Sequence, residues 1–182
     1  MFCLTVDDEI KLCLREERHA KELFELVDAN RAYLREWMPW LDINRSVADT
    51  RQFIKSTLEQ YTANKGFQTG IIYRGKIVGI IGFHQFDWPN RSTSLGYWLA
   101  ANAQGKGIIT RACRYLVNYA FTDLSMNRVE IRCATGNHKS RAIPERLGFK
   151  IEGTTRQAEW LYDHFVDHII YAMLAKEWQT EA

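Results

Sequence analysis

The chain has 182 residues, a length typical of one domain, and its 46% hydrophobic and 13% aromatic content can fill a core without disulfides or structural metal. The net charge of +2 is too small to indicate a nucleic-acid-binding protein. The first eight residues lack the pattern of a signal peptide, and no apolar run reaches the ~20 residues of a membrane span, so we expect one cytoplasmic domain over residues 1–182.

The first third of the chain predicts one strand followed by three helices. Apolar and charged or small residues alternate over residues 10–14, which indicates a strand. Apolar residues recur at helical spacing over residues 18–27, and a second short helix is expected over residues 30–38, before Pro39. Ser46 is placed to cap a third helix, with Asp49 three residues later.

The remaining two thirds alternate between strands and helices. Segments 68–73 and 76–86 are rich in β-forming residues and meet at Arg74 and Gly75, which predicts a tight hairpin. The pattern predicts four more strands and two helices: strand 93–99, helix 105–121, strand 128–134, helix 139–147 ending at Gly148, and strands 149–152 and 159–174. This order predicts a mixed α/β (α+β) domain, with a sheet covered by helices.

The cysteines and the C-terminal histidines are the candidates for metal or redox chemistry. Four cysteines lie among apolar neighbours without a C-x-x-C pair: Cys3, Cys13, Cys113 and Cys133. We expect all four to be buried, reduced thiols. His164 and His168 share a strand face but are separated by about 13 Å along it. This spacing is too wide for one ion, so no metal site is expected.

A glycine-rich turn follows the strand that ends at Leu99. It contains Gln104, Gly105, Lys106, Gly107, Ile108, Ile109 and Thr110 and leads into a helix. Glycines allow close approach of a ligand, and the free N–H groups at the helix start attract anions. The turn therefore predicts a pyrophosphate cradle, to which Thr110 adds a hydroxyl donor. It matches neither the P-loop nor G-x-G-x-x-G, and the alternative is a simple structural joint.

Two motifs in this order resemble the GNAT acetyltransferase family. The Gln-x-x-Gly motif at 104–107 resembles the family's pyrophosphate loop, although Ile109 stands where the family usually has Gly or Ala. The Asn-x-x-Ser and Leu-Gly-Phe motifs within 137–149 resemble its second signature. The sequences at 96–99 and 156–160 further resemble the RimJ/RimL subgroup, which acetylates N-termini of ribosomal proteins. The resemblance implies a GNAT-like fold with a central, mostly antiparallel, twisted sheet.

The resemblance also implies the cofactor and the residues that hold it. Acetyl-CoA (coenzyme A) would bind the 104–110 turn and the strand end formed by Tyr97, Trp98 and Leu99. A backbone N–H near Trp98 or Leu99 would stabilise the oxyanion. Asn137 would hydrogen-bond the pantetheine arm, although an asparagine after Gly136 is also a common turn residue.

Catalytic roles follow from the same resemblance. Glu159 is the expected base for the acceptor ammonium, against the alternative of an ordinary strand glutamate. Ser140 is the expected proton donor to the departing thiolate, and it is also suited to cap a helix. His84 is a reserve base in the substrate cleft. Trp37 and Trp40, in the helical insert, would line the acceptor cleft or simply pack in the core.

The acceptor amine is open between alternatives. The subgroup implies the N-terminal α-amine, at serine, of a ribosomal protein. A small-molecule amine such as an antibiotic, a polyamine or an amino-acid derivative is the second enzymatic reading, and an acyl-CoA-binding module without catalysis is the third. The resemblance implies a monomer or a homodimer, with no direct nucleic-acid or membrane partner.

Overall fold

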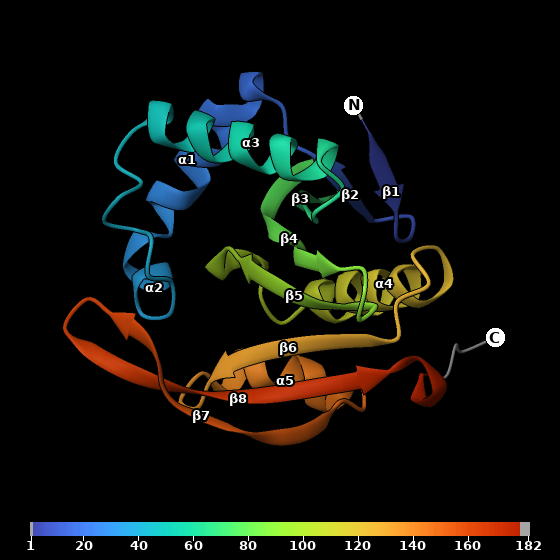
Figure 1. The fold of residues 1–182 in the computed structure, drawn as a ribbon. Helices are drawn as coiled ribbons and strands as arrows, with labels where there is room; N and C mark the ends of the chain where they lie inside the picture. Colours follow the sequence, from blue (N-terminus) through green and yellow to red (C-terminus); the bar gives the residue numbers. More distant parts are fainter. Residues whose placement is uncertain (1, 179–182) are drawn as a thin grey trace.

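The computed structural model describes residues 2–178, and their strands form one twisted sheet (Figure 1). Neighbouring strands run antiparallel except for β5 and β6, which are parallel. Across the sheet the eight strands lie in the order β1 (Cys3–Thr5), β2 (Ile10–Leu14), β3 (Phe67–Tyr73), β4 (Lys76–Asp87), β5 (Ser92–Leu99), β6 (Arg128–Ala134), β8 (His164–Leu174) and β7 (Lys150–Leu161). The predicted class, a mostly antiparallel sheet flanked by helices, is confirmed.

Helices cover both faces of this sheet (Figure 1). They are α1 (Ala20–Ala29), α2 (Arg31–Arg35), α3 (Val47–Thr62), α4 (Ile108–Thr122) and α5 (His138–Arg146), with short 3-10 turns η1 (Glu17–His19), η2 (Ala101–Ala103) and η3 (Ala175–Glu177). In β4, Ile80 belongs to the apolar cluster that includes Ile54 of α3. The next residue, Ile81, belongs to the main cluster with Leu116 of α4. Because successive residues of a strand face opposite sides, β4 is buried on both faces.

Local signals explain several boundaries. The Ser46 hydroxyl accepts the Asp49 N–H at 3.2 Å, so the predicted cap of α3 is confirmed. Arg74 and Gly75 both have positive φ, 48° and 82°, between paired residues Tyr73 and Lys76. This is the backbone that a two-residue hairpin requires. α4 begins at Ile108 rather than at 105, because Gly107 adopts φ 68°, which a right-handed helix excludes.

Two predicted elements differ in extent. The helix expected over 30–38 ends at Arg35, where the N–H groups of Trp37 and Met38 both bond to the Leu34 carbonyl. The strands expected over 149–152 and 159–174 are instead one long hairpin, with β7 continuous and a turn at Tyr162. Register shifts in β7 accommodate the residues that break its alternating pattern.

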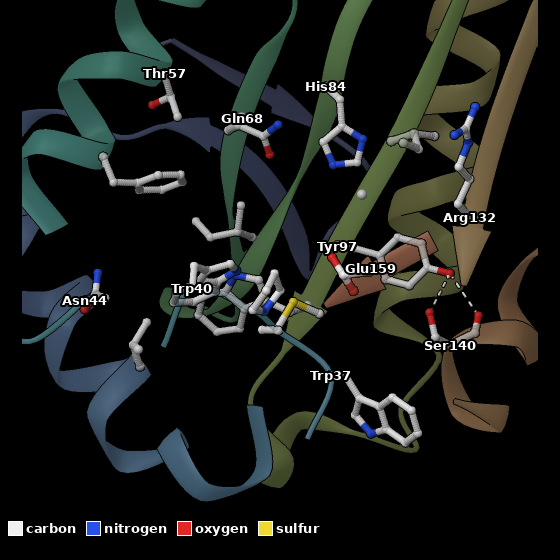
Figure 2. Close-up of a pocket in the computed structure, with 18 of the residues that line it drawn as sticks. Trp37, Trp40, Asn44, Thr57, Gln68, His84, Tyr97, Arg132, Ser140 and Glu159 are labelled. Atoms are coloured by element: carbon white, nitrogen blue, oxygen red, sulfur yellow. Dashed lines mark hydrogen bonds between the residues drawn. The ribbon is translucent and has the colours of Figure 1, made fainter. Parts of the chain in front are cut away.

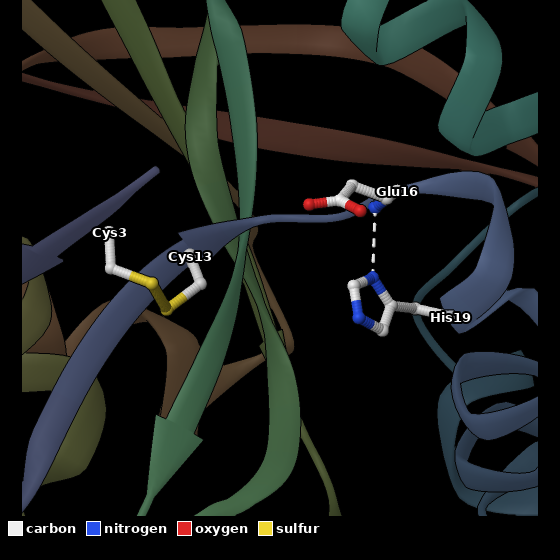
Figure 3. Close-up of a disulfide and its surroundings, with 4 residues drawn as sticks. All are labelled: Cys3, Cys13, Glu16 and His19. Atoms are coloured by element: carbon white, nitrogen blue, oxygen red, sulfur yellow. Dashed lines mark hydrogen bonds between the residues drawn. A yellow bond between two sulfur atoms is a disulfide. The ribbon is translucent and has the colours of Figure 1, made fainter. Parts of the chain in front are cut away.

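The expectation of four reduced cysteines is wrong for one pair. Cys3 and Cys13 form a disulfide (Figure 3). Cys113 and Cys133 are free and buried. The strand β1 was not predicted, and it places Cys3 directly opposite Cys13 with their Cα atoms 4.1 Å apart. Facing antiparallel positions meet the distance needed for a bridge, which the sequence pattern around each cysteine does not reveal.

Residues 2–178 contain neither a membrane-spanning helix nor a cluster of metal ligands. None of their helices combines the length and apolar character of a membrane span. They also include no group of three or more His, Cys, Asp or Glu side chains that could hold a metal ion.

Candidate active site

The centre of the sheet opens where the parallel pair β5 and β6 separates. The two strands pair from Ser92 with Arg128 to Leu95 with Ile131, yet β5 continues to Leu99 and β6 to Ala134. On its other edge β5 stays paired with β4 up to Leu99. After Leu95, the N–H and C=O groups of β5 that point toward β6 have no partner strand. They face an opening that an extended ligand can fill.

The register shows which groups of β5 face that opening. The Ala100 N–H donates to the Val78 carbonyl at 2.7 Å, which assigns the backbone of Ala100 to the β4 side. Alternation along an antiparallel strand then assigns Trp98 to the same side and turns the N–H groups of Tyr97 and Leu99 toward the opening. These amides are donors for a linear amide ligand or for an oxyanion.

The glycine-rich turn lies at the N-terminus of α4. Gly105 and Gly107 have φ of 76° and 68°, and a Cβ added to either would meet no atom within 4 Å. The turn is therefore open as well as dependent on glycine. Basic side chains surround it: Lys139 donates to the Gln104 side chain at 3.1 Å, and Arg146 donates to the Thr110 hydroxyl at 2.8 Å. Cationic groups around free helical N–H groups suit a pyrophosphate.

A cavity of about 740 Å³ lies between the sheet and the helical insert formed by α2 and α3 (Figure 2). It brings together eight of the residues singled out in the sequence: Trp37, Trp40, His84, Tyr97, Trp98, Asn137, Ser140 and Glu159. Leu99 and the 104–110 turn do not line it. They belong to the β5–α4 junction, so the predicted residues divide between this cavity and that junction.

Ser140 lies in the first turn of α5 within a partly buried polar cluster (Figure 2). The Tyr97 hydroxyl donates to the Ser140 carbonyl oxygen at 2.9 Å, and the Ser140 hydroxyl is 3.5 Å from the same phenol oxygen and 3.3 Å from the Cys133 sulfur. Burial raises the pKa of Tyr97 well above its ordinary value and raises the pKa of the Cys133 thiol. Both neighbours therefore stay protonated, and they orient a neutral hydroxyl.

Asn137 caps the same helix. Its side-chain oxygen accepts the Ser140 N–H at 3.1 Å, which is the turn role that the sequence left open. Asn137 lines the cavity, and its side-chain NH₂ is not used by the cap, so it can still donate to a ligand. The capping role and the predicted ligand contact are thus compatible in one residue.

Glu159 extends from β7 toward the cavity and faces His168 of β8. Glu159 Oε2 lies 3.4 Å from His168 Nε2, with 29% and 17% of the two side chains exposed. A register shift between Thr155 and Glu159 sets the direction of this part of the strand. Within the shift, the Gln157 N–H donates to the Asp167 carboxylate at 2.7 Å. The Glu159 carboxylate is therefore held at the edge of the cavity by the register shift in β7 and by its contact with His168.

His84 approaches the same cavity from β4. Its Nδ1 lies 3.1 Å from the Ser94 hydroxyl, and its ring crosses Gly96, where an added Cβ would be 2.3 Å from Nε2. Gly96 therefore makes room for the imidazole. Although His84 borders open space, surrounding protein desolvates its ring, and Arg132 adds positive charge. Both effects lower the pKa of His84, so it is a neutral base at pH 7.

Three residues of this site were not identified as functional from the sequence. The sequence alone suggests a candidate metal ligand at His168, a buried thiol at Cys133 and an apolar helix position at Phe53. The structure places all three on the cavity lining. His168, Cys133 and Phe53 are not joined to Glu159, Ser140 and Trp40 by any local sequence motif. The pairing of β7 with β8 is the information that was missing for His168.

Comparison with known proteins identifies this arrangement. A family model described as an acetyltransferase (GNAT) domain matches residues 11–150. The chain belongs to the GNAT acetyltransferases. YdaF of Bacillus subtilis, provisionally named a ribosomal N-acetyltransferase, is 40% identical over the full length of both chains. The ribosomal-protein-serine acetyltransferase of Escherichia coli is 28% identical, with 94% of this chain and 96% of that protein covered.

Two solved structures show the same GNAT fold with ligands. The microcin C7 self-immunity acetyltransferase MccE, in complex with acetyl-CoA and AMP, is 34% identical, with 93% and 94% coverage and a TM-score of 0.89. RimL, the ribosomal L7/L12 α-N-protein acetyltransferase, in complex with coenzyme A that forms a disulfide with a cysteine, is 25% identical. Its coverage is 95% of this chain and 98% of that chain, with a TM-score of 0.92.

The chain is therefore an N-acetyltransferase that uses acetyl-CoA, and its residues fit that group. The open glycine turn with its basic neighbours suits the pyrophosphate. The separated ends of β5 and β6 suit the amides of an extended pantetheine arm.

Proposed function

We propose that the enzyme acetylates the N-terminal α-amine of a ribosomal protein, with serine as the first residue. The carrying observation is that Glu159, His84 and Ser140, from three separate elements, line one cavity next to the opening between β5 and β6. The ribosomal acceptor is supported by RimL and by the serine acetyltransferase of Escherichia coli. Such an acceptor would locate the activity in the cytoplasm.

In the proposed reaction, Glu159 accepts the proton of the acceptor ammonium, directly or through water. An α-ammonium has a pKa of about 7.7–8.0, so a nearby carboxylate can remove this proton near neutral pH. The free amine attacks the thioester carbonyl, and the amide N–H of Tyr97 or Leu99 stabilises the oxyanion. The carbon–sulfur bond then breaks, and the Ser140 hydroxyl donates a proton to the departing thiolate. Trp37, Trp40 and His84 contact the acceptor.

The cofactor would lie along the β5–α4 junction. Its contacts come from Tyr97, Trp98 and Leu99, from Gln104 through Thr110, and from the Asn137 side chain. In this arrangement Thr110 donates its hydroxyl to a phosphate oxygen while accepting from Arg146. Monomer and homodimer are distinguished by light scattering of the purified enzyme.

Two substitutions test the catalytic roles. We expect Glu159→Gln and Ser140→Ala each to lower kcat about 100-fold or more, because each removes one proton-transfer group. The dissociation constant for acetyl-CoA, measured by calorimetry, should stay within about twofold for Glu159→Gln, because that side chain is outside the cofactor contacts. Wild-type turnover in both variants would refute the assignment.

A second candidate acceptor is a small-molecule amine that carries a planar ring. Trp40 and Phe53 line the cavity with Trp37, and Phe53 is 40% exposed. Aromatic faces of this kind stack on planar groups. The similarity to MccE, whose structure contains AMP, supports a nucleotide as the ring-bearing part.

Mass spectrometry distinguishes the two acceptors. Acetyl-CoA and the enzyme are offered ribosomal proteins in parallel with polyamines, aminoglycosides and aminoacyl-nucleotide analogues. An acetyl group on an N-terminal serine peptide supports the first proposal. Acetylation of small amines alone would exclude it. Binding of acetyl-CoA without acetylation of any amine would instead support a non-catalytic module.

A further inference from the structure

The tip of the β7–β8 hairpin is tied to the helical insert by one side chain, that of Tyr162. The Leu41 N–H donates to the Tyr162 hydroxyl oxygen at 3.2 Å, and this hydroxyl donates to the Met38 carbonyl oxygen. These contacts join segments more than 120 residues apart in sequence. Figure 1 shows the hairpin tip reaching the region of α2. Met38 itself lines the acceptor cavity, so the contact lies at the cavity wall.

A second interaction holds the same ring. The guanidinium of Arg35 lies 3.7 Å from the centre of the Tyr162 ring. Arg35 is fixed by two hydrogen bonds to the Asp42 carboxylate, at 2.9 and 2.8 Å. Arg35 and Asp42 belong to the same insert, so the ring is held at its face and at its hydroxyl by groups from one side. Burial raises the pKa of Tyr162, which keeps the phenol protonated and able to donate.

The backbone at this position also departs from ordinary strand geometry. Tyr162 adopts φ 60°, a left-handed conformation that is costly for a residue with a bulky side chain. A glycine would adopt this backbone conformation at a lower conformational cost. The contacts of the Tyr162 side chain offset that cost for the tyrosine. Gln157, with φ 49°, is the other such residue in this hairpin, and it is anchored to Asp167.

Glu159 lies between these two fixed points. Its strand segment begins at the anchored Gln157 and ends at Tyr162, and its carboxylate faces His168 and the cavity. A chain of only five or so residues between two anchors has little freedom to move. Motion of the free tip would otherwise carry the carboxylate away from the acceptor, and small displacements of a catalytic group are costly.

We infer that Tyr162 is a positioning residue, which locks the hairpin tip to the insert and so holds Glu159 toward the acceptor amine. The inference rests on the proposed function of Glu159 as the base. Under this inference, loss of the contact between Tyr162 and the backbone of Met38 and Leu41 lowers acceptor turnover and leaves acetyl-CoA binding unchanged. If the contact served fold stability alone, its loss would leave the acceptor kinetics of the folded enzyme unchanged.

The test substitution is Tyr162→Phe, which removes the hydroxyl and keeps the ring under Arg35. We expect exchange of the Leu41 amide to rise about tenfold, because its acceptor is lost. We expect kcat/KM for the acceptor to fall about tenfold, with the dissociation constant for acetyl-CoA within about twofold of the wild type. Arg35→Gln, which removes the cation above the ring, should lower kcat/KM in the same direction.

Tyr61→Phe is the matched control, since Tyr61 lies on α3 and does not line the cavity. Its acceptor kinetics should equal those of the wild type. A rise in Leu41 exchange in Tyr162→Phe with wild-type acceptor kinetics would overturn the inference.

A further readout is independent of turnover. The ring resonances of His168, recorded by NMR, report the position of the Glu159 carboxylate beside it. We expect them to shift in Tyr162→Phe and not in Tyr61→Phe. If the wild type acetylates no amine, the proposed function fails, yet the resonances still decide whether Tyr162 positions Glu159. Unchanged resonances in Tyr162→Phe would show that it does not.

Discussion

His84 and His19 are histidines whose neutral form the fold favours. Desolvation lowers the pKa of His84, and Arg132 contributes. Desolvation likewise lowers the pKa of His19, whose Nδ1 accepts the Glu16 N–H at 3.0 Å (Figure 3). An imidazole that accepts at this nitrogen must lose the hydrogen bond on protonation.

The lowered pKa values predict how stability depends on pH. Below about pH 6.5 the unfolded chain protonates these histidines before the folded chain does, so the unfolded state binds more protons. The contribution of these two histidines to the free energy of unfolding is therefore fully present above about pH 6.5. It is lost as the pH falls below this value through the lowered pKa values of the folded state. We expect the wild-type Tm to fall more between pH 7 and pH 5.5 than that of His84→Gln, with the double variant His84→Gln/His19→Gln least affected. Equal changes of Tm in all three proteins would contradict the lowered pKa values of His84 and His19.

Single residues also show what a sequence can and cannot predict of the site. Ser140, Asn137 and the glycine turn lie in short sequence motifs, so the family resemblance identifies each of them as a candidate site residue. His168 and Tyr162 act through partners on other elements, at Glu159 and at Leu41. Only the pairing of strands and the docking of the hairpin tip bring these groups together. The contacts of His168 and Tyr162 can therefore be seen in the folded structure but cannot be predicted from a local sequence pattern.

At the scale of elements, α3 depends on its N-terminal cap. The Ser46 hydroxyl accepts the Asp49 N–H and donates to the Asp49 carboxylate at 2.8 Å. We expect Ser46→Ala to lower the free energy of unfolding by about 1 kcal/mol, measured by urea denaturation. Ser56→Ala, on the exposed side of the same helix, is the control, and its effect should be within about 0.5 kcal/mol of zero. Equal losses in the two variants would show that the cap is not responsible.

The start of α4 depends on backbone conformation instead. Gly107 has φ 68°, and an added Cβ would meet no atom within 4 Å, so Gly107→Ala introduces strain without a clash. We expect a loss of about 1–2 kcal/mol in the free energy of unfolding. Gly107 is part of the glycine turn proposed to hold the pyrophosphate, so acetyl-CoA affinity should fall as well.

Gly153→Ala provides the comparison for this helix start. Gly153 has φ 158° and open space around it, but it lies on β7, away from the cradle. Stability should fall there with acetyl-CoA affinity retained. If both variants bind acetyl-CoA as the wild type does, the glycine turn does not hold the cofactor.

Elements with strong local signals were predictable, and those fixed by tertiary pairing were not. Ser46 and the Arg74–Gly75 turn each act on neighbouring residues, and the elements that they delimit lie close to the predicted positions. The helix expected up to Pro39 instead ends at Arg35. β1 has only three residues, too few for any periodicity, and it exists because it pairs with β2. The middle of β7 contains Gly153 and the bulge near Gln157, which interrupt the alternation that marks a strand.

For the whole molecule, the Cys3–Cys13 disulfide is a covalent tie at one edge of the sheet. It joins β1 to β2 across ten residues of sequence, and neither cysteine lines the cavity or the glycine turn. We expect unreduced, denatured protein to expose two reactive thiols, those of Cys113 and Cys133, and reduced protein to expose four. Four reactive thiols in the denatured protein without reductant would mean that the bridge does not form.

The bridge should affect stability far more than binding. Closing a loop of this length stabilises the folded state by about 2–3 kcal/mol in the chain-entropy model. We expect the Cys3→Ser/Cys13→Ser variant to lose up to that amount in urea denaturation and to keep its acetyl-CoA affinity within about twofold, since three strands separate β1 from β5. The same loss should follow reduction of the wild type, and reductant should not affect the variant. A large loss of affinity would instead show that the edge strand influences the cofactor site through the β1–β2 turn, where Asp7 pairs with Arg111 of α4.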